Sequence, residues 1–212
     1  MAVHTLLRRK SLPTGMKEAL EMIRRNVQVE SHFIDDLLDL TRISRGKLEV
    51  LRDPLDLHEA VQHAMQISHP DFDAKNQRLS VARDATEHQL IGDATRLKQV
   101  FWNVLKNAAK FSPDGTEIFV RCRNEPGRRL LEVSDHGIGF EPEHAERIFD
   151  PVTQATERVT REFGGLGLGL AIAKASVEAH GGNLRATSAG PGSGATFTID
   201  LPLTSPTDSL AA

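Results

Sequence analysis

Two asparagines and a lysine recur at helical spacing within residues 103–111. Because Asn103, Asn107 and Lys110 are four and three residues apart, a helix places their side chains on one face. An amide oxygen is a hard, neutral ligand for Mg²⁺, and a lysine neutralises phosphate charge. The face therefore predicts contact with a magnesium-bearing polyphosphate. For this segment alone, the solvated face of an ordinary amphipathic helix stays an open alternative, although asparagine is a poor helix former.

A second group of residues, Asp135-His136-Gly137-Ile138-Gly139, follows an apolar stretch that ends at Val133. A carboxylate at a strand end can accept a hydrogen bond from an exocyclic amine such as that of adenine. Glycines let the backbone approach a flat ring closely. The group therefore predicts a site for a purine base, with a common strand-to-turn pattern as the alternative.

The third group is glycine-rich, Gly164-Gly165-Leu166-Gly167-Leu168-Gly169-Leu170, and leads into an apolar segment at 171–174. Glycines before a helix expose unpaired N–H groups at the positive end of its dipole, where anions bind. No Gly-Lys-Ser/Thr follows, which excludes a Walker A loop. A dinucleotide fingerprint would need a parallel strand before the glycines, and the preceding residues instead indicate a lid-like loop. Together and in this order, the three groups predict a nucleotide site.

A long amphipathic helix is predicted before these groups, over residues 15–47. Its apolar stripe, with Leu20, Ile23 and Val27, is broad enough to require other helices against it, which favours a bundle over a core helix of one compact domain.

The remaining pattern predicts short alternating elements. Asp93 is a plausible N-cap, Pro54 breaks the pattern before the second helix, and His69-Pro70 ends that helix. Strands paired across turns, with helices between them, indicate an α+β sandwich rather than a doubly wound parallel sheet. We expect helices over 55–67, 94–111 and 166–180, strands over 79–82, 88–91, 118–122, 130–133, 183–189 and 195–201, a hairpin turn at 124–127, a further segment at 142–148, and an irregular stretch at 149–165.

The bulk composition is that of a globular protein. The 212 residues carry a net charge of -3, so there is no overall basic field for nucleic acid or anionic lipid. A single cysteine, Cys122, suits a reducing compartment. Neither an apolar run of about 20 residues nor a signal peptide is evident. We therefore expect a cytoplasmic chain, or the cytosolic part of a larger sensor, that contacts neither membrane nor nucleic acid.

With these motifs in place, residues 19–203 resemble the histidine-kinase branch of the ATPase superfamily that also contains DNA gyrase, a heat-shock chaperone and a mismatch-repair ATPase. Residues 103–111 resemble its N box, 135–139 and 165–169 its two glycine boxes, and Ile148-Phe149-Asp150-Pro151 the F box that opens the ATP lid. The stretch Ile34 to Lys47 resembles the second helix of the dimerisation hairpin. The resemblance implies an α+β fold: a helical hairpin stub, then an ATP-binding α/β sandwich of the Bergerat type with a mixed sheet and a flexible lid.

The resemblance also implies roles for single residues, with ATP and Mg²⁺ as ligands. Asn107 would bind the Mg²⁺, and Asn103 and Lys110 the phosphates or the metal shell. Asp135 would accept from the adenine amine. The implied nucleotide site also includes Phe111, Gly137, Ile138 and Gly139 near the base, Gly165, Leu166, Gly167, Leu168 and Gly169 along the phosphates, and Arg161 of the lid at the terminal phosphate.

One position separates the branches of this superfamily. The gyrase-like branch has a glutamate four residues before the metal-binding asparagine, where it activates water, and Asn103 stands there in this sequence. Without that general base, transfer to a protein acceptor is favoured over hydrolysis. Val152 and Leu166 depart from the usual F box and second glycine box, which bears on lid packing more than on nucleotide binding.

The family's phospho-accepting histidine has no counterpart here. His4 lacks the acidic residue that usually follows the acceptor, and His32 falls in what resembles the second hairpin helix. The prediction is therefore a truncated dimerisation region at 1–50, an ATP-binding catalytic domain at 51–203 and a disordered tail at 204–212.

The implied function is that of the catalytic module of a two-component sensor histidine kinase, transferring the ATP γ-phosphoryl group to a histidine outside this chain. A response regulator receiver domain and a homodimer or heterodimer partner for the helical stub are the implied partners. Two alternatives stay open: a degenerate ATP-binding or dimerising regulator, and a serine kinase of the anti-sigma type, against which the hairpin segment argues.

Overall fold

A computed structural model describes residues 14–151 and 167–203, which fall into two compact units divided after Gly46. The described part of the first unit is one helix, α2 (Thr14–Ser44), close to the range predicted. Gly46, at φ 62°, follows its end, and its N–H donates to the Ile43 carbonyl. Several apolar side chains of α2 are exposed: Met16, Met22, Ile23, Val27, Ile34, Leu37 and Leu38. The side chain of His32 lies outside the described residues.

The second unit is built on a five-stranded mixed sheet with the order β2-β4-β5-β7-β6. The strands are β2 (Arg78–Arg83), β4 (Glu117–Glu125), β5 (Arg128–Ser134), β6 (Asn183–Thr187) and β7 (Thr196–Pro202). β2 and β4 are parallel, and the other neighbours are antiparallel. A separate two-stranded sheet pairs β1 (Asp53–Asp56) with β3 (Gln89–Gly92). The mixed sheet and the interspersed helices confirm the predicted α+β class.

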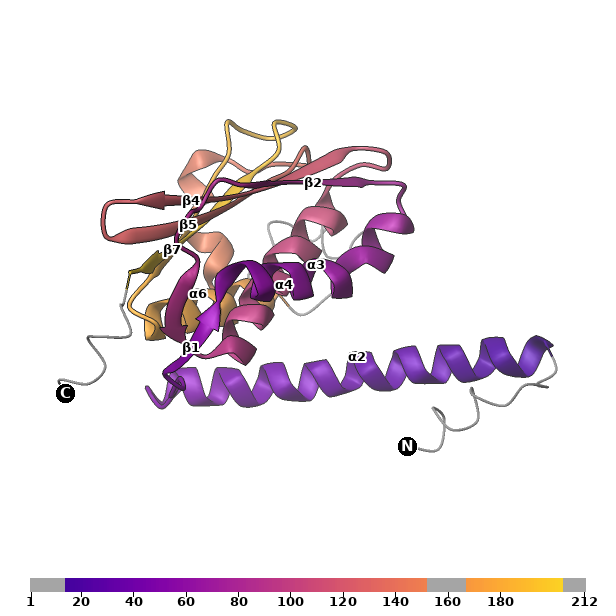
Figure 1. Cartoon of the computed structure of the whole chain (residues 1–212). Coiled ribbons are helices and arrows are strands. Elements are labelled where there is room, and N and C mark those ends of the chain that lie inside the picture. The colour runs from indigo at the N-terminus through magenta and orange to yellow at the C-terminus, as the bar shows by residue number, and fades with distance from the viewer. Residues whose placement is uncertain (1–13, 152–166, 204–212) are drawn as a thin grey trace. The chain divides into compact units, whose positions relative to one another are not determined.

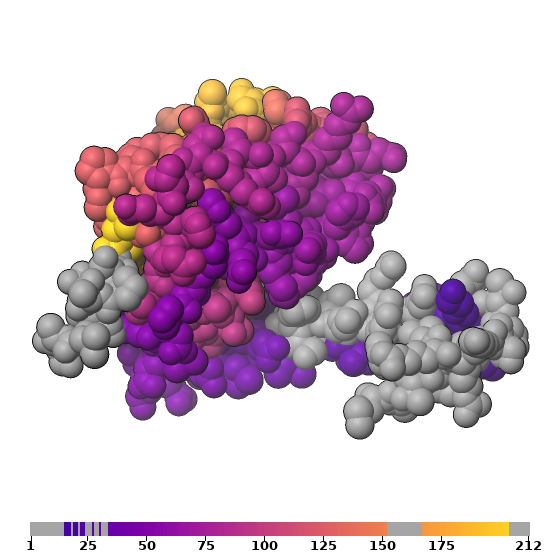
Figure 2. Space-filling view, in the orientation of Figure 1, coloured from indigo at the N-terminus to yellow at the C-terminus, as the bar shows by residue number. Residues whose placement is uncertain are grey.

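Three helices, α3 (Leu57–Asp73), α4 (Ala94–Phe111) and α6 (Gly169–Ala179), cover one face of the large sheet (Figure 1). α4 lies between the other two and packs against both. α4 begins where it was predicted because the Asp93 carboxylate accepts from Thr95 N and Arg96 N, which satisfies two free donors of its first turn. The side chains of residues 50–90 form much of the surface of this unit that Figure 2 turns to the viewer.

The two faces of the sheet differ in chemistry, as β4 shows. Ile118, Val120 and Cys122 are buried toward the helices, whereas Phe119 between them is 40% exposed. This alternation follows from the two-residue period of a strand. The core contains Leu57, Val61, Leu97, Phe101, Val104, Leu105, Ile118, Val120, Leu131, Val133, Val177, Leu184, Phe197 and Ile199.

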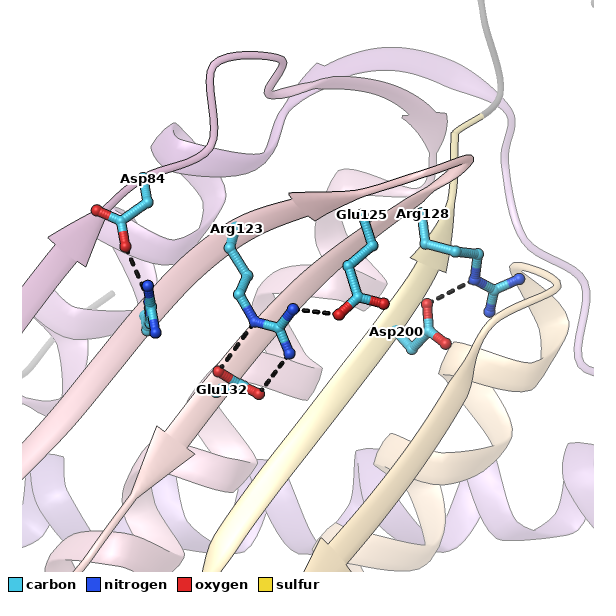
Figure 3. A network of polar contacts seen from close by, with 7 residues as sticks. Asp84, Arg123, Glu125, Arg128, Glu132 and Asp200 are labelled. Atoms are coloured by element: carbon cyan, nitrogen blue, oxygen red, sulfur yellow. Dashed lines mark hydrogen bonds and ion pairs between the residues drawn. The ribbon is translucent and has the colours of Figure 1, made fainter.

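The opposite face carries ion pairs that bridge neighbouring strands (Figure 3). Arg123 of β4 contacts Glu132 of β5 with both Nε and an amino group. The Nε of Arg128 in β5 lies 2.6 Å from Oδ1 of Asp200 in β7. The guanidinium of Arg123 also pairs with Glu125 of its own strand. This face of the sheet is therefore charged, which suits exposure to solvent.

Some predicted boundaries were wrong. Residues 53–56 form β1, and the following helix starts at Leu57 because Asp56 caps it through His58 N and Glu59 N. That helix runs past Pro70 and ends at Asp73, so the one hydrogen bond that proline cannot donate, to the carbonyl four residues before it, is lost close to the end of the helix.

Two further boundaries near the glycine-rich segment also differ from the prediction. The segment at 142–148 is two short 3-10 turns, Pro142–His144 and Arg147–Phe149. The helix predicted from residue 166 begins at Gly169, because Gly167 has φ 69° and cannot be helical. Residues 204–212 and most of the stretch at 149–165 lie outside the described residues, together with the lid. Within the described ranges, no helix has the length and hydropathy needed to cross a bilayer.

Candidate functional site

α4 positions the first predicted group. Its apolar residues face the core, and Asn103 is only 6% exposed on the side that meets α6. The Asn103 Nδ2 donates to the Gly169 carbonyl at 3.0 Å, and a Cβ added at Gly169 would lie 3.1 Å from Asn103 Oδ1. A side chain larger than hydrogen at residue 169 would crowd this amide. The first and third groups are therefore in direct contact.

Asn107 and Lys110 lie further along α4 and are partly exposed. The side chain of Asn107 makes no hydrogen bond to any residue in the described ranges, so its amide can accept an external ligand. The Lys110 ammonium lies 4.7 Å from the centre of the Phe111 ring. Partial burial, and then the positive charge of Lys106, lower the pKa of Lys110. An anion bound beside this ammonium would oppose this shift, because a nearby opposite charge favours the protonated form.

Asp135 lies in the turn after β5 and is only 9% exposed. Its Oδ1 accepts from Gly137 N at 2.8 Å and from Ala195 N at 3.2 Å, so two segments distant in sequence fix one carboxylate oxygen. Burial raises the pKa of this carboxyl, although both N–H donors and the nearby His136 oppose that shift. The second oxygen, Oδ2, has no hydrogen bond within the described residues, and that leaves it able to accept from a ligand.

The turn of Asp135 is joined to the end of α4. Ile138 N donates to the Phe111 carbonyl at 3.2 Å, and a Cβ at Gly137 would lie 2.8 Å from that same oxygen. Glycine is required at 137 because the backbone of α4 passes so close. Since Asn107 lies one helical turn before Phe111, the first and second groups belong to one continuous region.

The other end of the turn meets the segment before β7. Gly139 has φ 58°, and a Cβ there would lie 2.4 Å from the Gly190 carbonyl. The Ile138 side chain between the two glycines is 38% exposed, an apolar surface beside Asp135. An exposed apolar residue next to a hydrogen-bond acceptor suits a flat aromatic ring with an amine.

Only part of the third group can be placed. Gly167 forms a bend, Leu168 is 3% exposed and acts as a hydrophobic anchor, and Gly169 begins α6. Arg161, Gly165 and Leu166 lie outside the described residues, so their predicted contacts stay predictions.

Two residues that help to position the site, Gly194 and His180, were not predicted from the sequence. A Cβ at Gly194, φ 72°, would lie 2.0 Å from the Asp135 carbonyl oxygen, so this glycine determines where Asp135 sits. The glycine-rich run at 190–194 was the available signal.

The second is His180, which joins the end of α6 to the start of α4. Its Nε2 accepts from Asp93 N at 2.9 Å, while its Nδ1 lies 2.7 Å from the Ser176 carbonyl. With the bond between Asn103 and Gly169, this contact fastens the antiparallel helices α4 and α6 at two places.

Residues 92–205, more than half of the chain, match the family model of the histidine kinase-, DNA gyrase B- and HSP90-like ATPases. The chain belongs to this ATPase family. The match includes α4, the turn of Asp135 and the start of α6, so the three groups lie inside the region that defines the family.

Among curated members of this ATPase family, the sensor-like histidine kinase SenX3 of Mycolicibacterium smegmatis is 33% identical over 82% of this chain and 46% of its own length. A solved structure of the mycobacterial sensor histidine kinase MprB is 32% identical, with a TM-score of 0.62 over 72% of this chain and 97% of that one. Full-length ShkA in complex with AMPPNP has a TM-score of 0.75 over 94% of this chain and 41% of that one; at 24% identity it supports the fold alone. The chain thus spans less than half the length of SenX3.

Proposed function

We propose that the chain binds Mg-ATP on the surface formed by α4, the turn at 135–139 and the start of α6. The observation that supports it most directly is the pair of contacts that α4 makes, from Asn103 to Gly169 and from Phe111 to Ile138. They bring a carboxylate acceptor, an unengaged amide and an ammonium to neighbouring positions on one helix and its adjoining turn.

Each side chain has a definite task in this proposal. Asp135 Oδ2 accepts from the adenine amine, and Ile138 packs against the ring. Lys110 neutralises phosphate charge, and the N–H groups at the start of α6 face the phosphates. Arg161, Gly165 and Leu166 complete the phosphate contacts from the lid side.

The residues present suit a magnesium ion. Asn107 offers a neutral oxygen ligand without an internal hydrogen bond, and Mg²⁺ in nucleotide sites takes few protein ligands and several from phosphate and water. Bound there, the metal would neutralise charge on the phosphate oxygens. Asn103 and Lys110 would complete its surroundings, Asn103 by holding Gly169 and Lys110 by its charge.

We infer that the reaction is phosphoryl transfer to a histidine rather than rapid hydrolysis. Asn103, at the position where a general base would stand, is an amide that cannot take a proton at neutral pH. The chain's own residues then act by orienting the nucleotide and balancing its charge, and the acceptor imidazole is a histidine outside residues 1–212. We assign the ATP-binding domain to residues 51–203 and the helical region to 1–50.

The partners and the setting follow from the same proposal. The curated relative SenX3 is a sensor-like histidine kinase, and the ShkA structure holds AMPPNP, an ATP analogue. We propose by analogy that this chain works in the cytoplasm within a two-component system, passing phosphate toward a response regulator receiver domain. The exposed apolar side chains of α2 suit association with a second kinase chain.

A transfer assay tests the enzymatic part. The chain is incubated with γ-labelled ATP, Mg²⁺ and a separately made helical hairpin that carries an acceptor histidine, and we expect label that is lost in acid. Tight nucleotide binding without label on the hairpin would support a degenerate regulator instead. Acid-stable label on serine would point to a serine kinase.

Asn107→Asp tests the metal ligand. The added negative charge beside phosphate should weaken Mg-ATP binding by about tenfold or more, since a close like charge costs over 1 kcal/mol at a partly buried position. Calorimetric titration measures the affinity, with Asn183→Asp at the exposed start of β6 as the control. Equal affinity of the wild-type and Asn107→Asp chains would remove Asn107 from the site.

A further inference from the structure

A second polar cluster lies away from the three nucleotide groups, where the small sheet meets α3. Asp56 ends β1 and caps α3, His58 lies in the first turn of α3, and His88 directly precedes β3. One ligand atom from each of the three residues lies within 4.8 Å of the other two. Nothing in the proposed kinase chemistry uses these side chains.

The backbone around the cluster is held firmly. Asp56 pairs with Gln89 in the small sheet, and Leu57 N donates to the His88 carbonyl at 2.8 Å. The Asp56 carboxylate accepts from His58 N and Glu59 N through Oδ1 and from the Gln89 amide through Oδ2. A carboxylate oriented by such outer hydrogen bonds resembles those that support bound metals.

Each of the two imidazoles has one buried nitrogen without an aligned hydrogen bond. His58 Nε2 and His88 Nδ1 are both buried and have no hydrogen-bond partner in the described part of the chain. His88 Nδ1 nevertheless lies 2.9 Å from Asp56 Oδ2, an ion-pair contact that compensates it in part. Leaving a buried polar atom unpaired costs about 1–3 kcal/mol, so His58 Nε2, which has no such contact, needs an explanation.

We propose that Asp56, His58 and His88 form a binding site for a divalent transition metal of the Zn²⁺ type. Imidazole nitrogen and carboxylate oxygen are ligands that zinc prefers, at about 2.0–2.2 Å, which sets neighbouring ligand atoms of a tetrahedral site about 3.4 Å apart. His88 Nδ1 and Asp56 Oδ2, which are 2.9 Å apart, would have to separate by about half an ångström to hold the ion between them. The rings of His58 and His88 are stacked at 16°, with centres 4.8 Å apart, so the two imidazoles lie side by side next to the Asp56 carboxylate.

A neutral imidazole is the form that binds a metal. With three protein ligands, the fourth position of a tetrahedral site would be filled by water or by a ligand from another molecule.

Calorimetric titration of the whole metal-stripped chain with Zn²⁺ alone, without nucleotide or Mg²⁺, tests the proposal. We expect one site per chain, affinity at least tenfold weaker in His58→Ala and His88→Ala, and a higher thermal midpoint of the wild type with Zn²⁺. Asp56→Asn should also lose affinity while staying folded, because asparagine caps a helix as well as aspartate.

The control is His69→Ala, since His69 and Asp73 form an exposed pair on the same helix that could bind zinc adventitiously. Equal weakening by His69→Ala, or wild-type affinity in Asp56→Asn and both histidine variants, would overturn the proposal. Circular dichroism of each variant identifies loss of fold, and visible absorption of bound Co²⁺ reports the ligand set in those that remain folded.

Discussion

Replacing Asp135 with asparagine separates a role in binding from a role in folding. Asparagine keeps an oxygen for Gly137 N and Ala195 N, so the two hydrogen bonds that fix the turn survive. The pKa of Asp135 is raised by burial, and a raised carboxyl pKa means that stability present at low pH is lost as the pH rises through the folded-state pKa. At pH 7 the ionised carboxylate therefore lowers stability. The Asp135→Asn chain should unfold at the same temperature as the wild type, or at a higher one.

The affinity for ATP, in contrast to the stability, should fall in the Asp135→Asn chain. A hydrogen bond to a charged group contributes about 1.5–3 kcal/mol, and an amide N–H in place of the oxygen cannot accept from the adenine amine. This corresponds to about a tenfold to hundredfold increase in the Kd for ATP, with less discrimination against other bases.

Calorimetry with ATP and with GTP measures the nucleotide affinity and its base discrimination, and thermal unfolding of the free chain measures the stability. Asp114→Asn, an exposed aspartate after α4, controls for the change in net charge. Unchanged ATP affinity in Asp135→Asn would refute the assignment of the base site. A fall in unfolding temperature as large as that of a core mutation would show that the carboxylate is structural.

Two further predictions concern the framework around the site. Burial lowers the pKa of His180, against the opposing effects of Ser176 and Asp93, so the neutral ring is favoured in the folded state. The free energy of unfolding should therefore stay constant above about pH 6.5 and fall as the pH decreases below it. His180→Gln should make this fall with pH less steep, as measured by urea unfolding at several pH values. Gly194→Ala should lower the free energy of unfolding by about 2–4 kcal/mol, because the added Cβ would overlap the Asp135 carbonyl at a positive φ. Gly192→Ala is the control: residue 192 also has a positive φ, 79°, but open space around it, so the loss should be only about 1 kcal/mol. Equal losses in the two variants would contradict the steric explanation.

Much of the fold could be predicted because local signals and tertiary structure agree. α4 has a capping aspartate at its start, an apolar stripe and a polar face, and both of its ends were predicted correctly. The element boundaries that were predicted wrongly depend on contacts that leave no local pattern in the sequence. β1 has four residues, too few for an alternating pattern, and it exists because it pairs with β3, about 35 residues along the chain.

The proposed site shows the same difference between local and distant signals. Asn107, Lys110 and Asp135 could be proposed from the sequence because their spacing and residue types suggest a ligand. The buried contact of Asn103 with Gly169 was not predicted, since spacing along one helix does not reveal which helix lies opposite. His180 and Gly194 act through partners that are distant in sequence, and no local pattern reports such partners.

The order of the large sheet leaves β2 and β6 at its two edges. A strand edge is a template on which another chain can add a strand, and repeated addition leads to aggregates. β2 begins with Arg78 and ends with Arg83, both exposed, and β6 carries the exposed Arg185 at its centre. Where two copies of the same edge meet in antiparallel register, these like charges would come close together and oppose edge-to-edge growth. If the chain associates with a second copy, as proposed above, the exposed apolar side chains of α2 are better suited to that contact than either strand edge.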